Sequence, residues 1–318
     1  MKIVIVDGYA LNPGDLSWDS IYALGETTVY DRTAQKDIIT RCKEADIVLT
    51  NKVPFSRQTL AALPNLKFIG VTATGYNIID TQAAREHGVV VTNIPAYSTV
   101  SVAQSVMALL LAVTNRVEHY TKQVKEERRW TKNADFCYWD TQLTELAGKR
   151  MGIFGYGRIG QQVGLLAQAL GMEVVVHTSK DPKVLPVGIN KLTGEKFWST
   201  CDVISLHCPL TAETNQLINT ATLQMMKTGA ILINTACGPL VDEQAVANAL
   251  KDGKLRAYCC DVLSQEPAAN DNPLLDAENV FVTPHIAWAT LEARQRLMDI
   301  LVGTVKAFIE GKPTNVVN

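Results

Sequence analysis

The sequence predicts an α/β protein with two doubly wound parallel-sheet domains, and three observations lead to this prediction. Short apolar segments alternate with helical patterns along two successive stretches of the chain, which is the order that parallel sheets flanked by helices require. Hydrophobic residues make up 47% of the composition, enough for sizeable cores. With 318 residues, the chain exceeds the typical domain size of about 150 residues, so a single core is not expected to organise all of it.

The first series is expected to form a small parallel sheet. Its predicted segments are strands near residues 2–6, 46–49, 67–71 and 89–91 and helices near 56–61 and 81–86. Pro95 then breaks the chain, and a long apolar-rich stretch without Gly or Pro predicts one continuous helix from about 101 to 126. A helix of this length is expected to span a domain or to form a dimer interface.

The second series follows a polar, aromatic stretch at 130–140 and is expected to form a doubly wound sheet. Its later segments are predicted strands at 203–206, 230–233, 255–259 and 280–282 and a helix near 243–251. After Pro284 the chain is expected to form a last helix over about 291–310.

The beginning of the second series carries a glycine motif that is typical of dinucleotide sites. A strand after Met151 leads into Gly155, Gly157 and Gly160, and an apolar helix and a strand at 173–176 follow. The first glycine permits the tight turn, the second lets the backbone approach a pyrophosphate, and the third lets the helix lie close to the strand. The alternative is a glycine-rich turn in an unrelated α/β protein, but the flanking strand and helix favour a nucleotide site.

Composition excludes several other classes of function. A formal charge of −2 without a long basic run gives no reason to expect nucleic acid as a partner. The apolar start at 1–6 is too short for a signal peptide and no apolar run reaches membrane-spanning length, so we expect a cytoplasmic protein with a small-molecule partner. Seven cysteines without a Cys-x-x-Cys pair indicate neither a disulfide framework nor a metal site; most are interpreted as small buried hydrophobes.

Four segments make a family resemblance specific. The stretches 234–242, 261–267 and 283–287 resemble, in order and spacing, the three signature segments of the D-isomer-specific 2-hydroxyacid dehydrogenases, and 73–77 resembles the substrate loop of that family. Residues 136–140 and 285–288 are most similar to glycerate dehydrogenases, which also act as hydroxypyruvate reductases.

The resemblance also implies an architecture. It predicts a flavodoxin-like substrate domain of about residues 1–99 and 288–318, a Rossmann-like cofactor domain of about 100–287, and a substrate cleft between them. The family is usually dimeric, so we expect a homodimer with the 101–126 helix and the arm after it in the interface. Trp139 is then expected to reach the substrate pocket of the neighbouring subunit.

The chemistry of a 2-oxo acid reduction independently requires a proton donor at the carbonyl oxygen, and histidine suits this task near neutral pH. His285 is the candidate, and Glu266 occupies the position in the family of the carboxylate that orients it. A lone histidine is usually packed or on the surface and a lone glutamate is usually solvated, so both assignments depend on the matched segments.

The substrate carboxylate is expected to meet backbone amides near Thr74 and Gly75. The family adds an arginine just before the glycine of its Asn-Thr-Ala-x-Gly segment, whereas this chain has Cys237. A thiol cannot make the bidentate, charge-assisted contact of an arginine, so the site is expected to be weakened; a nucleophilic role for Cys237 is disfavoured because the reaction has no covalent step. Lys52 is a candidate cation for this cleft, although a solvated loop lysine explains it equally well.

Cofactor preference depends on the end of the second strand of the glycine unit. NAD enzymes usually place an acidic residue there, but this chain has Thr178, Ser179 and Lys180, and Asp181 comes too late to match. These residues suit a 2′-phosphate, so NADP is slightly favoured over NAD. The resemblance adds further cofactor contacts: Arg158 and Ile159 at the pyrophosphate, Cys208 and Pro209 near the adenosine, and Thr235, Ala236 and Asp261 near the nicotinamide, where Asp261 would orient the carboxamide.

The sequence therefore predicts an oxidoreductase that transfers a hydride between NAD(P) and a small D-2-hydroxy acid or 2-oxo acid of the glycerate, hydroxypyruvate or glyoxylate type. Cys237 leaves one alternative open, a catalytically impaired sensor or scaffold of the same fold that only binds dinucleotide. The presence of both His285 and Glu266 favours the enzyme.

Overall fold

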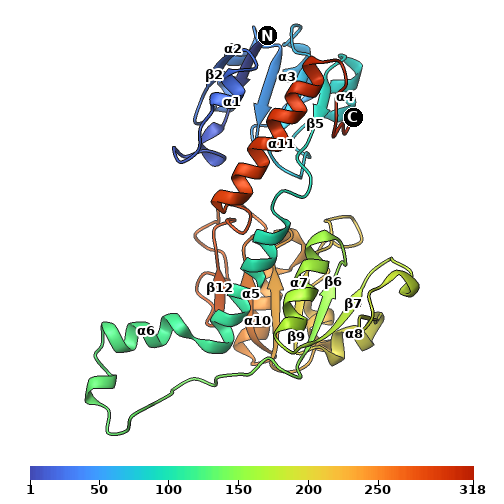
Figure 1. Cartoon of the computed structure of the whole chain (residues 1–318). Helices are drawn as coiled ribbons and strands as arrows, with labels where there is room; N and C mark the ends of the chain where they lie inside the picture. The colour runs from blue at the N-terminus through green and yellow to red at the C-terminus, as the bar shows by residue number, and fades with distance from the viewer. The chain divides into compact units, whose positions relative to one another are not determined.

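The computed structural model describes all residues of the chain, Met1–Asn318, and shows two compact units. The first unit is discontinuous and consists of Met1–Ser98 and Ala289–Asn318. The second unit is the continuous stretch Thr99–Trp288. Each unit contains one parallel sheet, and each is described here by itself (Figure 1).

The sheet of the first unit has five parallel strands in the order β2-β1-β3-β4-β5. These strands are β1 (Lys2–Ile5), β2 (Glu26–Val29), β3 (Ile47–Thr50), β4 (Phe68–Val71) and β5 (Val90–Thr92). The order is that of flavodoxin-like sheets, in which ligands bind beyond the carboxyl ends of the strands where the strand order reverses. The helical segments of this unit are η1 (Gly8–Ala10), α1 (Asp19–Tyr22), η2 (Gln35–Asp37), α2 (Ile38–Cys42), α3 (Arg57–Ala61), α4 (Thr81–Glu86) and α11 (Leu291–Ile309).

The sheet of the second unit has seven parallel strands in the order β12-β11-β10-β9-β6-β7-β8. Its strands are β6 (Arg150–Phe154), β7 (Glu173–His177), β8 (Asn190–Lys191), β9 (Val203–Leu206), β10 (Ala230–Asn234), β11 (Leu255–Cys260) and β12 (Val280–Val282). Counted from β6, this is the 3-2-1-4-5-6 order of dinucleotide-binding sheets with one more strand at the edge. The shorter helices are α7 (Arg158–Ala169), η4 (Pro182–Val184), α8 (Gly194–Thr200), α9 (Thr220–Met225), η5 (Gly238–Leu240) and α10 (Glu243–Lys251).

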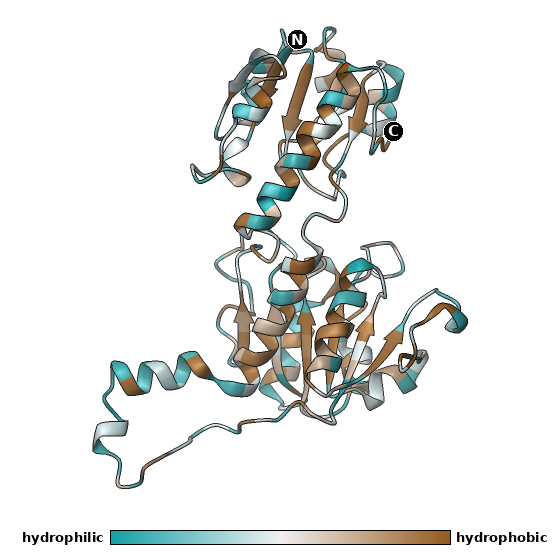
Figure 2. Ribbon diagram, viewed as in Figure 1, coloured by the Kyte–Doolittle hydropathy of each residue, from teal (hydrophilic) through white to brown (hydrophobic).

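The central strands are buried along their whole length and mostly apolar, because helices cover both faces of a parallel sheet. Every residue of β3, β4, β9 and β10 is buried, and the central strands of both sheets are coloured mainly hydrophobic in Figure 2. This burial explains why apolar runs located these strands in the sequence. Two of the four edge strands, β2 and β8, are partly exposed and were not predicted, whereas the edge strands β5 and β12 were.

The prediction of one continuous helix over 101–126 is wrong. The chain forms α5 (Thr99–Asn115) and α6 (Val117–Lys125), which meet at 55° because Arg116 between them has a left-handed backbone with φ 52°. The Arg116 guanidinium donates to Asn279 Oδ1 at 2.6 Å and lies over the Phe281 ring at 5.1 Å. These contacts with the β12 region stabilise the break. The sequence did not predict it, because neither Gly nor Pro stands at this position.

An arm follows this break and projects from the rest of the second unit (Figure 1). It comprises α6, η3 (Trp130–Lys132) and the extended chain to about residue 145. Asp140 ties the arm together by accepting from Gln123 Nε2 at 2.6 Å and by bonding His119 Nε2 at 2.9 Å. The arm therefore has a defined internal structure.

No single helix of the chain is both long enough and apolar enough to span a membrane. Only α5 and α6 taken together, as a bent pair, reach that length and composition.

Candidate active site

The glycine turn after β6 has the geometry that a dinucleotide needs. Gly155 has φ +98°, and a side chain there would lie 2.6 Å from the backbone N of Cys208, in the segment that follows β9. A side chain at Gly160 would lie 2.3 Å from the carbonyl oxygen of Gly155, so the helix packs directly on the turn. The space beside Gly157 is open, and no side chain caps the first turn of α7 at Arg158. Free amides and an open approach are what a pyrophosphate requires.

Two ammonium groups, those of Lys180 and Lys191, lie near the end of β7 together with hydroxyl groups. Lys180 Nζ lies 5.7 Å from the centroid of the Tyr156 ring in the glycine turn. Lys191, at the end of β8, donates from Nζ to the Lys180 carbonyl oxygen at 2.9 Å. The Thr178 hydroxyl accepts from the Lys180 amide at 3.3 Å. Burial and the nearby Lys191 ammonium lower the pKa of His177, so the fixed positive charges here are the two lysines.

Asp181 does not take the place of the missing acidic residue at the end of β7. Its Oδ1 accepts from the Lys183 amide at 2.8 Å and caps η4. The sequence did not reveal that Lys191 lies beside this strand end, because β8 is a two-residue edge strand without an apolar run to mark it.

His285 and Glu266, which the sequence pairs as acid and orienter, are hydrogen-bonded. His285 Nδ1 lies 2.6 Å from Glu266 Oε2, and Glu266 Oε1 accepts from the Leu263 amide at 3.1 Å. The histidine side chain is 39% exposed. Because the carboxylate occupies Nδ1, the other ring nitrogen, Nε2, is the one that can face a ligand.

Asp261 holds the turn that carries His285. Its carboxylate is 2% exposed and accepts from the Thr283 hydroxyl at 2.6 Å, the Ile286 amide at 2.8 Å and the Ala287 amide at 2.8 Å. His285 has φ 55°, a left-handed conformation that is uncommon for residues other than glycine and that persists where the surroundings enforce it. A carboxylate accepts about four hydrogen bonds, so Asp261 retains room for one more donor.

The turn after β10, which contains Cys237, is held by Asn234. Asn234 Oδ1 accepts from the amides of Ala236 at 3.0 Å and Cys237 at 3.3 Å, and its Nδ2 donates to the Cys237 carbonyl oxygen at 2.8 Å. The Cys237 side chain is half-buried against the core on this face of the sheet. The hydroxyl of Thr235 is buried without a hydrogen-bond partner, as expected of a group that a bound cofactor would satisfy.

Two other titratable groups near the glycine turn are unsuited to acid catalysis. Burial lowers the pKa of His207 to about 4, and this ring is hydrogen-bonded to Ser205 Oγ at 2.8 Å. Burial raises the pKa of the Cys208 thiol to about 11. The prediction that most cysteines are buried is confirmed, since five of them are; the exceptions are the exposed Cys137 and the half-buried Cys237.

The predicted substrate residues of the first unit lie on loops at the carboxyl ends of neighbouring strands. Asp7, after β1, orders the loop after β3 by accepting from the amides of Asn51 at 2.8 Å and Lys52 at 2.6 Å. The Lys52 side chain is exposed. The Thr74 hydroxyl, after β4, donates to the Ile94 carbonyl oxygen at 2.9 Å, and Gly75 is exposed beside it. These loops follow the central strands of this sheet, as expected for a binding edge.

Trp139 does not lie at the strand ends of its own unit that carry the candidate site. It lies on the arm and is 70% exposed. Within the second unit, therefore, nothing places Trp139 at the candidate site.

The second unit thus combines three features: a dinucleotide turn, the unpaired Thr235 hydroxyl after β10, and a histidine held by a carboxylate. Together they define a nicotinamide-dependent oxidoreductase. Residues 107–287 match the model of the D-isomer-specific 2-hydroxyacid dehydrogenase NAD-binding domain. The chain is 49% identical over 322 residues to a hydroxypyruvate reductase of Blautia hydrogenotrophica, covering 100% of each chain. It is 43% identical over 285 residues to a glycerate dehydrogenase of Methylorubrum extorquens, covering 89% of this chain and 88% of the relative.

A solved structure extends the comparison to the whole fold. An acyclic imino acid reductase in complex with NADPH and D-Arg aligns over 100% of both chains with a TM-score of 0.86 and 30% identity. The chain belongs to the D-isomer-specific 2-hydroxyacid dehydrogenases. The family prediction is therefore confirmed, and so is the prediction of an oxidoreductase with a nicotinamide cofactor. The alternative of an impaired sensor finds no support in these relatives.

Proposed function

We propose that the protein reduces a small 2-oxo acid, hydroxypyruvate or glyoxylate, to the corresponding hydroxy acid and catalyses the reverse oxidation. The observation that carries this proposal is the 2.6 Å contact between His285 Nδ1 and Glu266 Oε2. It fixes the imidazole with Nε2 directed away from the carboxylate, so that Nε2 can donate a proton to a carbonyl oxygen. The names of the relatives, hydroxypyruvate reductase and glycerate dehydrogenase, support the choice of substrate.

The two units divide the work in this proposal. The unit Thr99–Trp288 holds the cofactor along Gly155–Gly160, the end of β7, Cys208–Pro209 and the Thr235–Ala236 turn, with Asp261 at the carboxamide. A bound nicotinamide supplies the hydride or takes it up. The first unit contributes Lys52, Thr74 and Gly75 to the substrate carboxylate.

The proposed cofactor is NADP(H) in preference to NAD(H). The adenosine 2′-phosphate would be bound by Thr178, Ser179 and Lys180, and Lys191 adds a second positive charge through its bond to the Lys180 carbonyl. Ammonium groups and hydroxyls stabilise a phosphate. The Asp181 carboxylate, which is engaged in capping η4, does not oppose it.

Cys237 defines how this enzyme differs from the pattern of its family. A thiol at this position forgoes the charge-assisted grip on the substrate carboxylate that an arginine provides. Losing a hydrogen bond to a charged group costs about 1.5–3 kcal/mol. We therefore propose that carboxylate binding depends on the first unit, with Lys52 as its cation, and that turnover of hydroxypyruvate is lower than an arginine would allow.

The proposed assembly is a homodimer formed through the arm. Large apolar side chains are exposed along it, with Phe136 at 88% and Trp139 at 70%. Exposed apolar surface of this kind marks an interaction site. In a dimer, Trp139 would reach the substrate pocket of the neighbouring subunit, which accounts for its distance from the sheet edges of its own unit.

Steady-state assays of nicotinamide absorbance with hydroxypyruvate and with glyoxylate test the proposed function. We expect NADPH-dependent reduction of at least one of the two, and oxidation of D-glycerate but not of L-glycerate. A protein that binds the cofactor with ordinary affinity but turns over neither 2-oxo acid would contradict the substrate assignment. In that case the acyclic imino acids are the next class to assay.

A further inference from the structure

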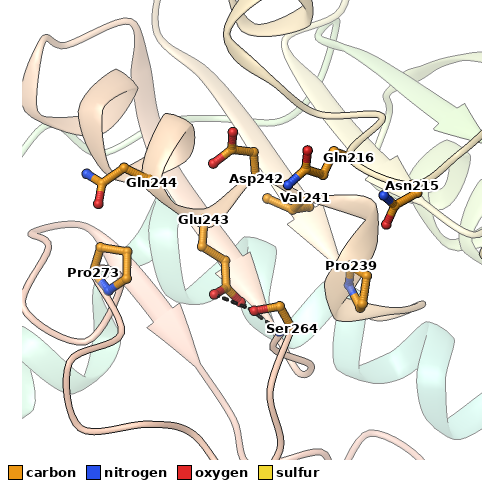
Figure 3. A pocket seen from close by; sticks show the side chains of 9 residues that line it. All are labelled: Asn215, Gln216, Pro239, Val241, Asp242, Glu243, Gln244, Ser264 and Pro273. Carbon is orange, nitrogen blue, oxygen red and sulfur yellow. Dashed lines mark hydrogen bonds between the residues drawn. The ribbon is translucent and has the colours of Figure 1, made fainter.

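Glu243, the first residue of α10, makes three hydrogen bonds to a loop that is distant in sequence. Its Oε1 accepts from the Ser264 amide at 2.7 Å, and its Oε2 accepts from the Ser264 hydroxyl at 2.7 Å and from Asn272 Nδ2 at 2.9 Å. Figure 3 shows the carboxylate directed at Ser264, with dashed lines for the bonds between these two residues. Glu243 forms no salt bridge, so these neutral donors are what stabilise its charge.

The loop that Glu243 holds is the one that carries Glu266. Ser264 lies two residues before Glu266, and the Leu263 amide beside it donates to Glu266 Oε1 at 3.1 Å. The other oxygen of Glu266 bonds His285. Hydrogen bonds and two short chain segments therefore connect the start of α10 with the imidazole.

The opposite side of this loop is fixed by direct backbone contact. A side chain at Gly238 would lie 1.9 Å from the Leu263 carbonyl oxygen and 2.4 Å from the Ser264 amide nitrogen, so the Cys237–Gly238 turn packs against the loop with nothing between them. The loop therefore lies between the turn after β10 and the carboxylate of Glu243. Removing either contact frees it to shift.

The start of α10 is a firm base for such a contact. Asp242 caps the helix by accepting from the Ala245 amide at 3.0 Å, and Val246 in its first turns is fully buried. A cavity of about 340 Å³ lies beside Glu243 and Ser264, so there is space into which the loop can relax once the carboxylate is lost.

We propose that Glu243 is a positioning residue of the active site, which sets the place of Glu266 and thereby the orientation of His285. This inference rests on the proposed roles of Glu266 and His285. It assigns to the first residue of α10 a function in turnover as well as in helix stability. Small misplacements of a catalytic group can cost up to about a hundredfold in rate, so the effect is expected in the chemical step.

The geometry explains why this residue has to be a carboxylate. Two acceptor oxygens serve three donors, and a glutamine of the same shape would place an N–H group opposite a donor in either orientation of its amide: opposite Asn272 Nδ2 in one and opposite the Ser264 backbone amide in the other. Asn272 cannot simply turn over, because its Oδ1 accepts from the Leu274 amide at 3.0 Å. Glu243→Gln is therefore a nearly isosteric variant that breaks the contact.

The test combines Glu243→Gln with Glu266→Gln in a double-mutant cycle. We expect Glu243→Gln to lower kcat for the preferred 2-oxo acid about tenfold, with the Kd of the cofactor unchanged within about twofold. In the Glu266→Gln background the same change should cost less than about twofold, because its effect passes through Glu266. Ser264→Ala, a small loop truncation, should reproduce part of the loss. Glu195→Gln is the matched control, since Glu195 is also an acid in the first turn of a helix of this unit, α8.

The outcomes separate this inference from the function on which it rests. If Glu266→Gln alone keeps the turnover of the parent, the proposed site is wrong. If Glu266→Gln is impaired but Glu243→Gln lowers kcat equally in both backgrounds, or only lowers Tm, Glu243 is a structural residue and the inference is overturned. An unchanged kcat in Glu243→Gln overturns it as well.

Discussion

Single residues decide how this enzyme departs from its family, and Cys237 is the foremost of them. The turn that holds it is well ordered, because Asn234 bonds the backbone on both sides of the residue. The backbone therefore presents the side chain at a fixed place whichever residue stands there. This makes the position suitable for substitution.

Cys237→Arg is expected to raise the reduction of hydroxypyruvate or glyoxylate by at least about tenfold, since a charge-assisted bidentate contact is regained. The gain should appear in both kcat and KM, because a guanidinium would hold the carboxylate and polarise the carbonyl. Steady-state kinetics in both directions measures it, with Ile39→Arg as the control, because Ile39 is exposed on α2, outside both the arm and the candidate site. A slower arginine variant would indicate a pocket built around the cysteine, with Lys52 as the carboxylate ligand.

His285 is the other decisive residue, and its variant separates chemistry from binding. His285→Asn should lower turnover by about a hundredfold or more, as expected for the loss of a general acid. Cofactor affinity should stay within about twofold, because the imidazole is not part of the glycine turn. Fluorescence titration and stopped-flow reduction measure the two, with the exposed His87→Asn as control. Parent-like turnover in His285→Asn would rule out this residue as the acid.

At the level of elements, the proposed preference for NADP depends on two strands that end side by side. β7 pairs with β8 in parallel, with Val176 opposite Lys191, and this pairing brings the Lys191 ammonium to the Lys180 carbonyl. Two lysines that are 11 residues apart in sequence thus serve one loop. The edge strand β8 has no buried residue, so in this proposal it acts on cofactor binding through the Lys191 side chain.

Lys180→Met and Lys191→Met should each weaken NADPH binding about tenfold and leave NADH binding within about twofold, because each removes a positive charge from the proposed 2′-phosphate site. Fluorescence titration of both cofactors is the measurement, and Lys183→Met in η4 is the control. Equal losses for NADH and NADPH would show that the lysines serve the fold. A parent protein that prefers NADH would refute the NADP proposal itself.

For the whole molecule, the two sheets have the strand orders of flavodoxin-like and dinucleotide-binding sheets, and the arm belongs to neither. The arm is ordered by its own hydrogen bonds around Asp140 and exposes Phe136 and Trp139. The single chain therefore leaves these two apolar side chains of the arm unburied. A second copy of the chain is the partner that the proposed function assigns to it.

Analytical ultracentrifugation should find a dimer, and Phe136→Asp should shift it toward monomer, because a charge would be buried in the proposed interface. Val187→Asp is the matched control, since Val187 is fully exposed on a loop outside the arm and should leave the dimer intact. A monomeric parent would remove the role proposed for Trp139, whereas a dimer insensitive to Phe136→Asp would move the interface away from the arm.

The sequence by itself determined the family, the alternation of strands and helices, the glycine turn, and the pairing of His285 with Glu266. These features are local: apolar runs mark buried parallel strands, and helices such as α4 and α10 lie where the pattern predicted them. The residues of the signature segments keep their order along the chain, so they could be recognised without coordinates.

Only the tertiary structure decided the contacts between distant segments. The bonds from Lys191 to Lys180, from Ser264 to Glu243 and from Ile286 to Asp261 span 11, 21 and 25 residues, and no local pattern encodes them. The break at Arg116 has the same origin, because contacts with Asn279 and Phe281 favour a left-handed backbone where local propensity favours a continuous helix. Periodicity reports which face of an element is buried, but the partner of a polar side chain is set by how the elements pack.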